Sequence, residues 1–244
     1  MWLNCLRSLS VSALLIAACA VSTIPIHADT IAWATWTSGT SGSPGSATGT
    51  IGSITVNYSG QTSGLLTDYP SWTPTTTFTG GVVGNAPPAI NNSVGLEGGV
   101  SFTETITFST VVADPIFAVW SLGAAGTPAS FDFSASEPFT VQGGGPSAEF
   151  GGTALTINGE DAEGQEGNGI IQFNGDFSSI TFTTPQFENF YAFTVGEDAT
   201  LTSQLPSGPP APPSSVPEPE TISLLVLGLA AIPFARRSLS RLRT

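Results

Sequence analysis

Histidine, cysteine and arginine, which supply many catalytic bases, nucleophiles and cations, are confined to the two ends of this 244-residue chain, and lysine does not occur in it. The stretch from Asp29 to Val216 has none of them, although it holds sixteen acidic residues. It therefore cannot build a Ser-His-Asp or Cys-His centre, a histidine or thiolate zinc site, or a guanidinium clamp for phosphate. Paired carboxylates, as used in glycoside hydrolysis, are the one catalytic device left. Because no spacing singles out such a pair, a non-enzymatic protein is the better hypothesis.

The charge balance limits the partners of this stretch. The whole chain has a formal net charge of −13, and the stretch without basic residues is near −16. Such a field repels phosphate backbones, so we expect no nucleic-acid binding. It attracts cations, Ca²⁺ among them, although an acidic balance also simply keeps an exported protein soluble.

One loop concentrates the acidic residues. The sequence "NGEDAEGQEGNG" at 158–169 holds Glu160, Asp161, Glu163 and Glu166 among glycines. Carboxylate oxygens are the ligands that Ca²⁺ prefers, so these four residues are the candidate metal ligands. The loop fails the EF-hand pattern, because an acidic residue stands where that loop requires a glycine. The alternative, which the sequence favours, is a solvated hairpin tip.

Aromatic residues supply a second candidate site. Tyr69 and Trp72 lie in "TDYPSWTP", a turn-rich stretch that we expect to be exposed, with Asp68 alongside to accept a hydroxyl. Flat rings of this kind stack on sugar faces in carbohydrate-binding proteins. The alternative is that these rings, like most aromatic residues, fill the core.

The elements that would hold these residues are strands. Apolar residues alternate with Thr, Ser and Asn, and Gly and Pro interrupt the pattern at intervals of roughly ten residues, which is typical of a sandwich or barrel. We predict an all-β fold, an antiparallel two-sheet sandwich of jelly-roll or lectin-like type, occupying residues 29–205. The predicted strands are 30–36, 51–58, 101–109, 116–122, 129–134, 139–143, 154–158, 169–173, 179–183 and 190–195.

The clearest of these strands is "SFTETITFS" at 101–109. Its alternation directs Phe102, Ile106 and Phe108 to one face, and Glu104 falls on that apolar face as an exception. The least regular region is 59–100, where prolines predict a long loop with at most short strands.

The first 28 residues have the features of an export signal. Arg7 gives a positive start, an apolar stretch follows, and Ile26-His27-Ala28 ends the segment, so we expect cleavage after Ala28. The alternative is a lipoprotein signal in which Cys19 is acylated. Both cysteines lie within this segment, so the exported part cannot form a disulfide.

The other end of the chain has three parts. Residues 206–219 form a proline-rich linker, which is extended and stiff. The uncharged segment 222–234 follows within the tail 220–244; as a helix its thirteen residues would span about 20 Å, less than the roughly 30 Å of a bilayer core. The basic cluster that ends the tail keeps its flank cytoplasmic under the positive-inside rule. This cluster consists of Arg236, Arg237, Arg241 and Arg243.

This ending resembles the C-terminal sorting signal of PEP-CTERM proteins. The resemblance rests on Val216-Pro217-Glu218-Pro219, the short apolar segment and the arginines, in that order at the terminus. It implies that an exosortase, a membrane-embedded protease, recognises Pro217, Glu218 and Pro219 and cleaves near them. It also implies a bacterium that makes extracellular polysaccharide, transient insertion in the inner membrane, and a final location at the cell surface or outside the cell.

Three hypotheses for the function follow. The first is a non-enzymatic surface or matrix protein that associates with exopolysaccharide in a biofilm. The second is a lectin-like module with a defined sugar site, with Ca²⁺ as its cofactor if the acidic loop binds it. The third and weakest is a hydrolase of matrix polysaccharide.

Overall fold

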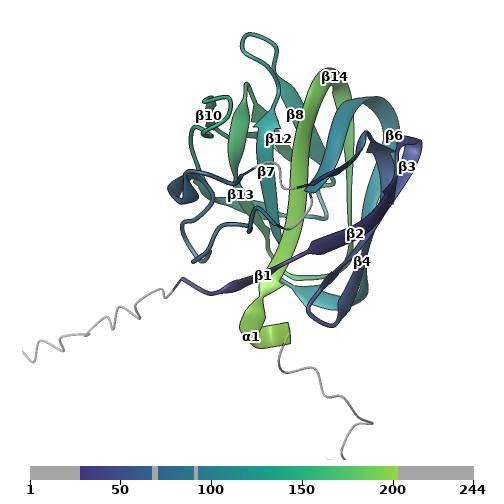
Figure 1. The fold of residues 1–244 in the computed structure, drawn as a ribbon, viewed down its shortest axis with the longest axis vertical. Coiled ribbons are helices and arrows are strands. Elements are labelled where there is room, and N and C mark those ends of the chain that lie inside the picture. Colours follow the sequence, from purple (N-terminus) through teal and green to yellow (C-terminus); the bar gives the residue numbers. More distant parts are fainter. Residues whose placement is uncertain (1–27, 68–70, 91–92, 203–244) are drawn as a thin grey trace, which may run out of the picture. The chain divides into compact units, whose positions relative to one another are not determined.

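The computed structural model describes residues 28–67, 71–90 and 93–202, which form a mostly antiparallel all-β sandwich (Figure 1). The predicted signal peptide, linker and C-terminal tail lie outside the described residues. The elements are β1 (Ile31–Trp33), β2 (Thr35–Thr40), β3 (Gly42–Ile51), β4 (Ile54–Thr62), β5 (Gly64–Leu66), the 3₁₀ turn η1 (Thr75–Thr77), β6 (Ser93–Ala113), β7 (Ile116–Leu122), β8 (Ala129–Phe133), β9 (Phe139–Gly144), β10 (Thr153–Ala154), β11 (Thr156–Asn158), β12 (Asp161–Gly164), β13 (Gly167–Phe173), β14 (Asp176–Asp198) and α1 (Ala199–Thr202).

Two long strands, β6 and β14, pair along their lengths and connect the two layers (Figure 1). The first half of β14 lies between β6 and β8, whereas its second half lies between β6 and β7. The pairing shifts four times, and one shift falls where Gly98 and Gly99 of β6 have positive φ. Such shifts bend a strand and increase its twist, which lets one strand serve two layers.

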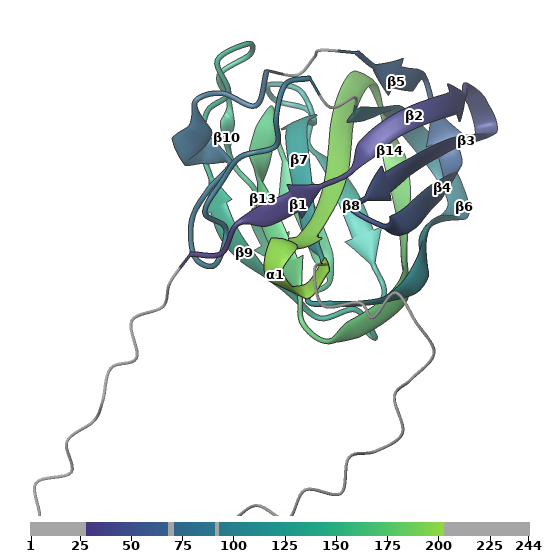
Figure 2. The ribbon, with the colours of Figure 1, turned by 60° about the horizontal axis from the view of Figure 1, so that its bottom comes forward.

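Six of the other strands extend the sheet in two directions from this pair (Figure 2). On one side β4, β3 and β2 follow β6 in order, each antiparallel to the next. On the other side β7 and β13 follow β14, and β9 pairs with β13.

The core between the layers is made largely of phenylalanine rings. Phe117 of β7 stacks on Phe193 of β14 with ring centroids 4.9 Å apart, and it meets Phe131 edge-on at 5.1 Å. Fully burying a side chain of this size contributes about 1.5–3 kcal/mol, and favourable ring geometry adds about 0.5–1.5 kcal/mol. Since the described residues include no cysteine, this packing takes the place of disulfide bonds.

The outer face of β7 is buried as well. All seven residues of β7 are buried, and Ile116, Ala118 and Trp120 pack in a second cluster with Trp72 and Phe78. The last two residues belong to the 71–90 segment, which therefore covers the outside of the sheet. A continuous apolar run is the expected pattern for a strand buried on two faces.

Most predicted strands are confirmed, and the differences follow from pairing. The predicted strands 179–183 and 190–195 are two parts of the single strand β14. The prediction of a long loop at 59–100 is wrong at its ends, because β4 continues to Thr62 and β6 begins at Ser93. Strand β3 was not predicted, because its Gly- and Ser-rich sequence lacks the apolar alternation.

The predicted faces of strand 101–109 are partly confirmed. Ile106, Phe108 and Glu104 are buried on one face. Phe102 is not buried with them, because it is 38% exposed. The β6–β14 pairing shifts between Phe182 and Thr184, beyond Glu104, and ends the regular alternation before Phe102.

Candidate functional site

A depression of about 170 Å³ lies where the end of β7, the β12–β13 turn and a bend of β14 meet the 147–151 loop. Its residues include two carboxylates, two phenylalanine rings, an amide and a hydroxyl. They are Ser121, Ala124, Phe150, Glu166, Glu188, Asn189 and Phe190.

Two irregularities of the sheet create this depression. In β7, Trp120 and Ser121 stand opposite the single residue Asn168 of β13, because the register moves from Leu122–Gly167 to Val119–Gly169. In β14, the segment 188–190 stands opposite Glu97 of β6, because the register shifts between Phe187 and Tyr191. Bulges of this kind redirect side chains and are frequent beside functional sites.

A buried amide holds the first bulge in place. Ser121 has a φ of 60°, which is uncommon for a residue other than glycine. Its N–H donates to Oδ1 of Asn168 at 2.8 Å, and Nδ2 of Asn168 donates to the Glu166 carbonyl at 2.8 Å. Asn168 is completely buried. It therefore positions Ser121 and Glu166 together and offsets a backbone strain of about 1–3 kcal/mol.

The two carboxylates are held by donors from the end of β7 and the residue after it. Oε2 of Glu166 accepts the Ser121 hydroxyl at 2.6 Å, and Oε2 of Glu188 accepts the Gly123 N–H at 2.6 Å. Burial raises the pKa of Glu188 to about 7, the Gly123 hydrogen bond opposes this rise, and the nearby Glu166 charge adds to it. Near neutral pH, Glu188 can therefore either donate a proton or accept a hydrogen bond.

Three rings form the apolar part of the site. Trp120 is fully buried, and its ring centroid lies 5.3 Å from that of Phe150 and 5.7 Å from that of Phe190. Its indole N–H donates to Oε2 of Glu149 at 3.2 Å. Oε1 of Glu149 accepts the Ser71 N–H and hydroxyl, which ties the rings to the 71–90 segment. Phe150 remains 44% exposed on this support.

The site combines what saccharide recognition requires. Ring faces contact the apolar C–H face of a pyranose, while carboxylates and an amide accept and donate hydrogen bonds at its edge. The described residues offer no His, Cys, Lys or Arg side chain here, so nucleophilic chemistry through such groups is excluded.

The expectation that Trp72 is an exposed sugar-stacking ring is wrong. Trp72 is 1% exposed and meets Phe78 edge-on, with ring centroids 5.0 Å apart. The turn-rich sequence around it covers the sheet and directs the indole inward. Tyr69 lies outside the described residues.

The structure does not bring the four predicted metal ligands together. Glu160 occupies the two-residue turn between β11 and β12, and Asp161 and Glu163 lie on β12. Glu166 belongs instead to the depression described above. Within residues 28–67, 71–90 and 93–202, no group of three or more acidic, histidine or cysteine side chains is arranged to hold a metal ion. The alternative of a hairpin tip is confirmed for Gly159 and Glu160 alone, because β12 and β13 occupy most of the remaining residues.

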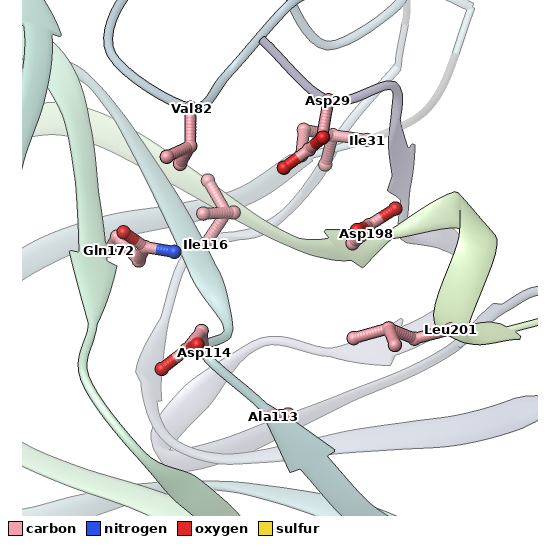
Figure 3. A pocket seen from close by; sticks show the side chains of 9 residues that line it. All are labelled: Asp29, Ile31, Val82, Ala113, Asp114, Ile116, Gln172, Asp198 and Leu201. Atoms are coloured by element: carbon pink, nitrogen blue, oxygen red, sulfur yellow. The ribbon is translucent and has the colours of Figure 1, made fainter. Parts of the chain in front are cut away.

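A second, smaller pocket of about 80 Å³ lies near the ends of the described chain (Figure 3). Figure 3 shows Asp29, Asp114 and Asp198 around it, from three separate elements. Asp114 accepts the Gly175 N–H at 2.7 Å, and Asp198 accepts the N–H and hydroxyl of Thr200. These two carboxylates therefore stabilise turns, and we assign no ligand to this pocket.

Sequence reasoning missed most of the depression. Of its residues, only Glu166 was singled out, and it was assigned to a metal loop. The available signal was "PQFENF" at 185–190, where polar residues interrupt two apolar runs. It indicates a break in a strand but does not reveal which residues face Glu166.

Comparisons of the chain with protein-family models, with curated proteins and with solved structures found no match. The predicted sorting motif Pro217, Glu218 and Pro219 and the basic cluster Arg236, Arg237, Arg241 and Arg243 lie outside the described residues. In the described part of the chain, no helix is long and apolar enough to cross a membrane.

Proposed function

We propose that the protein is exported, processed at its C-terminal tail by an exosortase, and acts at the cell surface or in the extracellular matrix as a non-enzymatic protein that associates with polysaccharide. The tail supports the processing step through its sequence, from Val216 to the terminal arginines. The observation that carries the association with polysaccharide is the depression at Phe150 and Phe190, where two phenylalanine rings and two carboxylates lie together.

This depression also favours the second hypothesis, a lectin-like body with a defined sugar site. Association through bulk charge alone requires no organised surface. Here Asn168 fixes the backbone and Glu149 fixes the Trp120 indole. The exposed ring of Phe150 lies against that indole. Groups held rigidly before binding lose little conformational freedom when a ligand arrives, which is typical of a specific site.

The test is a glycan array probed with the full-length protein in detergent. We expect saturable binding to a limited set of glycans, reduced at least tenfold by Phe150→Ala. Phe102→Ala is the matched control, because Phe102 is a phenylalanine of similar exposure, 38% against 44%, that does not line the depression. Absence of binding to every glycan would contradict the proposal, and release of reducing ends from a polysaccharide would contradict its non-enzymatic part.

A further inference from the structure

We propose that the depression binds a saccharide that carries a free, protonated amine, with its ammonium held between Glu166 and Glu188 and its ring against Phe150 and Phe190. This inference rests on the proposed function, because it names the chemical class of polysaccharide that the body would recognise.

The first argument is charge. No Lys, Arg or His occurs among residues 28–67, 71–90 and 93–202, so the part of the chain that the structure describes supplies no cation to either carboxylate. Of the other titratable groups nearby, Tyr191 interacts electrostatically with Glu188, and Glu149 accepts the Trp120 indole N–H. All of these groups are neutral or acidic. A ligand with uronate or sulfate groups would be repelled, whereas an ammonium would supply the missing countercharge.

The second argument is the way the carboxylates are held. Each one engages a protein donor through Oε2, and its other oxygen, Oε1, makes no hydrogen bond within the described residues. An ammonium has three N–H donors and no acceptor, which suits two carboxylates with unused acceptor oxygens. A sugar hydroxyl has a single O–H donor, so it could donate to only one of these oxygens.

The third argument is the ring cluster. Phe150 is 44% exposed, and Phe150 and Phe190 meet at 74° with centroids 5.7 Å apart, so they form two walls of a corner. The negative face of an aromatic ring attracts a cation within about 6 Å, and the same face contacts the C–H groups of a pyranose. Rings and carboxylates therefore favour the same ligand, a sugar with a positive charge.

A divalent cation fits the depression less well. Ca²⁺ takes six to eight oxygen ligands. The depression offers two carboxylates, the Ser121 hydroxyl and the Asn189 side chain, and the described residues provide no group of three acidic side chains that could hold a metal. The apolar rings have no part in such a site.

The test is calorimetric titration of the full-length protein in detergent at pH 6, where the sugar amine carries its proton. The probe is a glucosamine oligosaccharide with free amines, and the control ligand is the N-acetylated oligosaccharide of the same length. We expect at least tenfold tighter binding of the amine form. Because ammonium binding drives Glu188 to ionise, we also expect release of close to one proton per ligand, seen as a dependence of the heat on the buffer.

Three variants complete the test. Glu188→Gln retains an oxygen for the Gly123 N–H, and it should weaken binding at least tenfold and abolish proton release. Glu166→Gln should weaken binding of the amine form without changing that of the N-acetylated form. Phe102→Ala should bind as the unaltered protein does.

The outcomes separate this inference from the proposed function. Equal affinity for the two oligosaccharides, or tight binding without proton release, would overturn the inference and leave association with polysaccharide standing. Failure to bind any glycan on the array would overturn both. If Glu188→Gln fails to fold, proton release by the unaltered protein and the Glu166→Gln variant still decide the question.

Discussion

Glu104 departs from the apolar pattern of its strand face, yet its buried carboxylate has hydrogen-bond partners. It lies on the apolar face of β6 and is fully buried. Its carboxylate accepts hydrogen bonds from the Tyr58 hydroxyl, from the Gln61 N–H at 2.9 Å and from the Thr184 hydroxyl. Burial raises the pKa of Glu104, although these three hydrogen bonds oppose the rise. The residue thus connects β4, β6 and β14 through the core.

This network predicts a pH dependence of stability. Because the folded pKa of Glu104 is raised above its unfolded value of about 4.3, the stabilising contribution is complete below that value and is lost as the pH rises through the folded pKa. Glu104→Gln removes the ionisation. Its amide oxygen can accept the Tyr58 and Gln61 donors, and its amide nitrogen can donate to Thr184. We expect the variant to gain unfolding free energy relative to the unaltered protein between pH 4 and pH 8, measured by urea denaturation.

Comparison with the unaltered protein at each pH cancels the contribution of Glu188, whose raised pKa gives a pH dependence of the same sign. Glu104→Ala is the second control. It removes the acceptor of the buried Gln61 N–H and Thr184 hydroxyl and opens a cavity, so we expect a loss of about 2–5 kcal/mol at every pH. A Gln variant whose stability follows the unaltered protein in parallel from pH 4 to pH 8 would refute the role of Glu104.

At the scale of elements, strand positions were predictable because β-branched and aromatic residues with turn signals between them reflect local preferences. The sequence 116–122 corresponds to β7 without error. The bulges at Ser121 and at 188–190 were not predictable, because a bulge is defined by the partner strand and leaves no periodic mark on its own sequence. The candidate site consists largely of those bulges, so it was missed although the strands around it were found.

The 71–90 segment is the element whose role differs most from expectation. It was predicted as a loop, and most of it is irregular, but Phe78 is fully buried in the cluster that covers the outer face of β7. We predict that this segment is an integral layer, so Phe78→Ala should lower the unfolding free energy by about 3–5 kcal/mol. Urea denaturation measures this loss.

Ile90→Ala is the matched control in the same segment. Ile90 is 81% exposed, so its truncation should change stability by no more than about 0.5 kcal/mol. If Phe78→Ala lowers the unfolding free energy as little as Ile90→Ala does, the segment contributes little to the stability of the folded body.

For the whole molecule, the basic and acidic residues lie in different segments, so export and processing can be separated from ligand binding. The acidic body repels anionic ligands, whereas the basic residues stand at the ends, where the export signal and the sorting tail are expected. These functions can therefore be tested by independent substitutions. Changes in the tail should alter location without altering glycan binding, and changes at Phe150 should do the reverse.

The tail gives the last prediction. Replacing Pro217, Glu218 and Pro219 by alanine removes the proposed recognition element but leaves the apolar segment 222–234 and the arginines, which we propose hold the tail in the membrane. We expect the full-length form to accumulate in the membrane fraction, with at least tenfold less processed protein outside the cell. Cell fractionation and intact-mass measurement of each fraction record this change.

The matched control replaces Pro209, Pro210 and Pro212 by alanine, since these residues belong to the same proline-rich linker but lie outside the motif. If linker stiffness governs processing, the two variants will behave alike, because each replaces prolines of the linker. If the motif is read directly, the control will be processed normally and only the motif variant will be retained. Unchanged release of the motif variant would remove the basis for an exosortase as the processing enzyme, while the saccharide site of the body would remain to be judged by its own binding measurements.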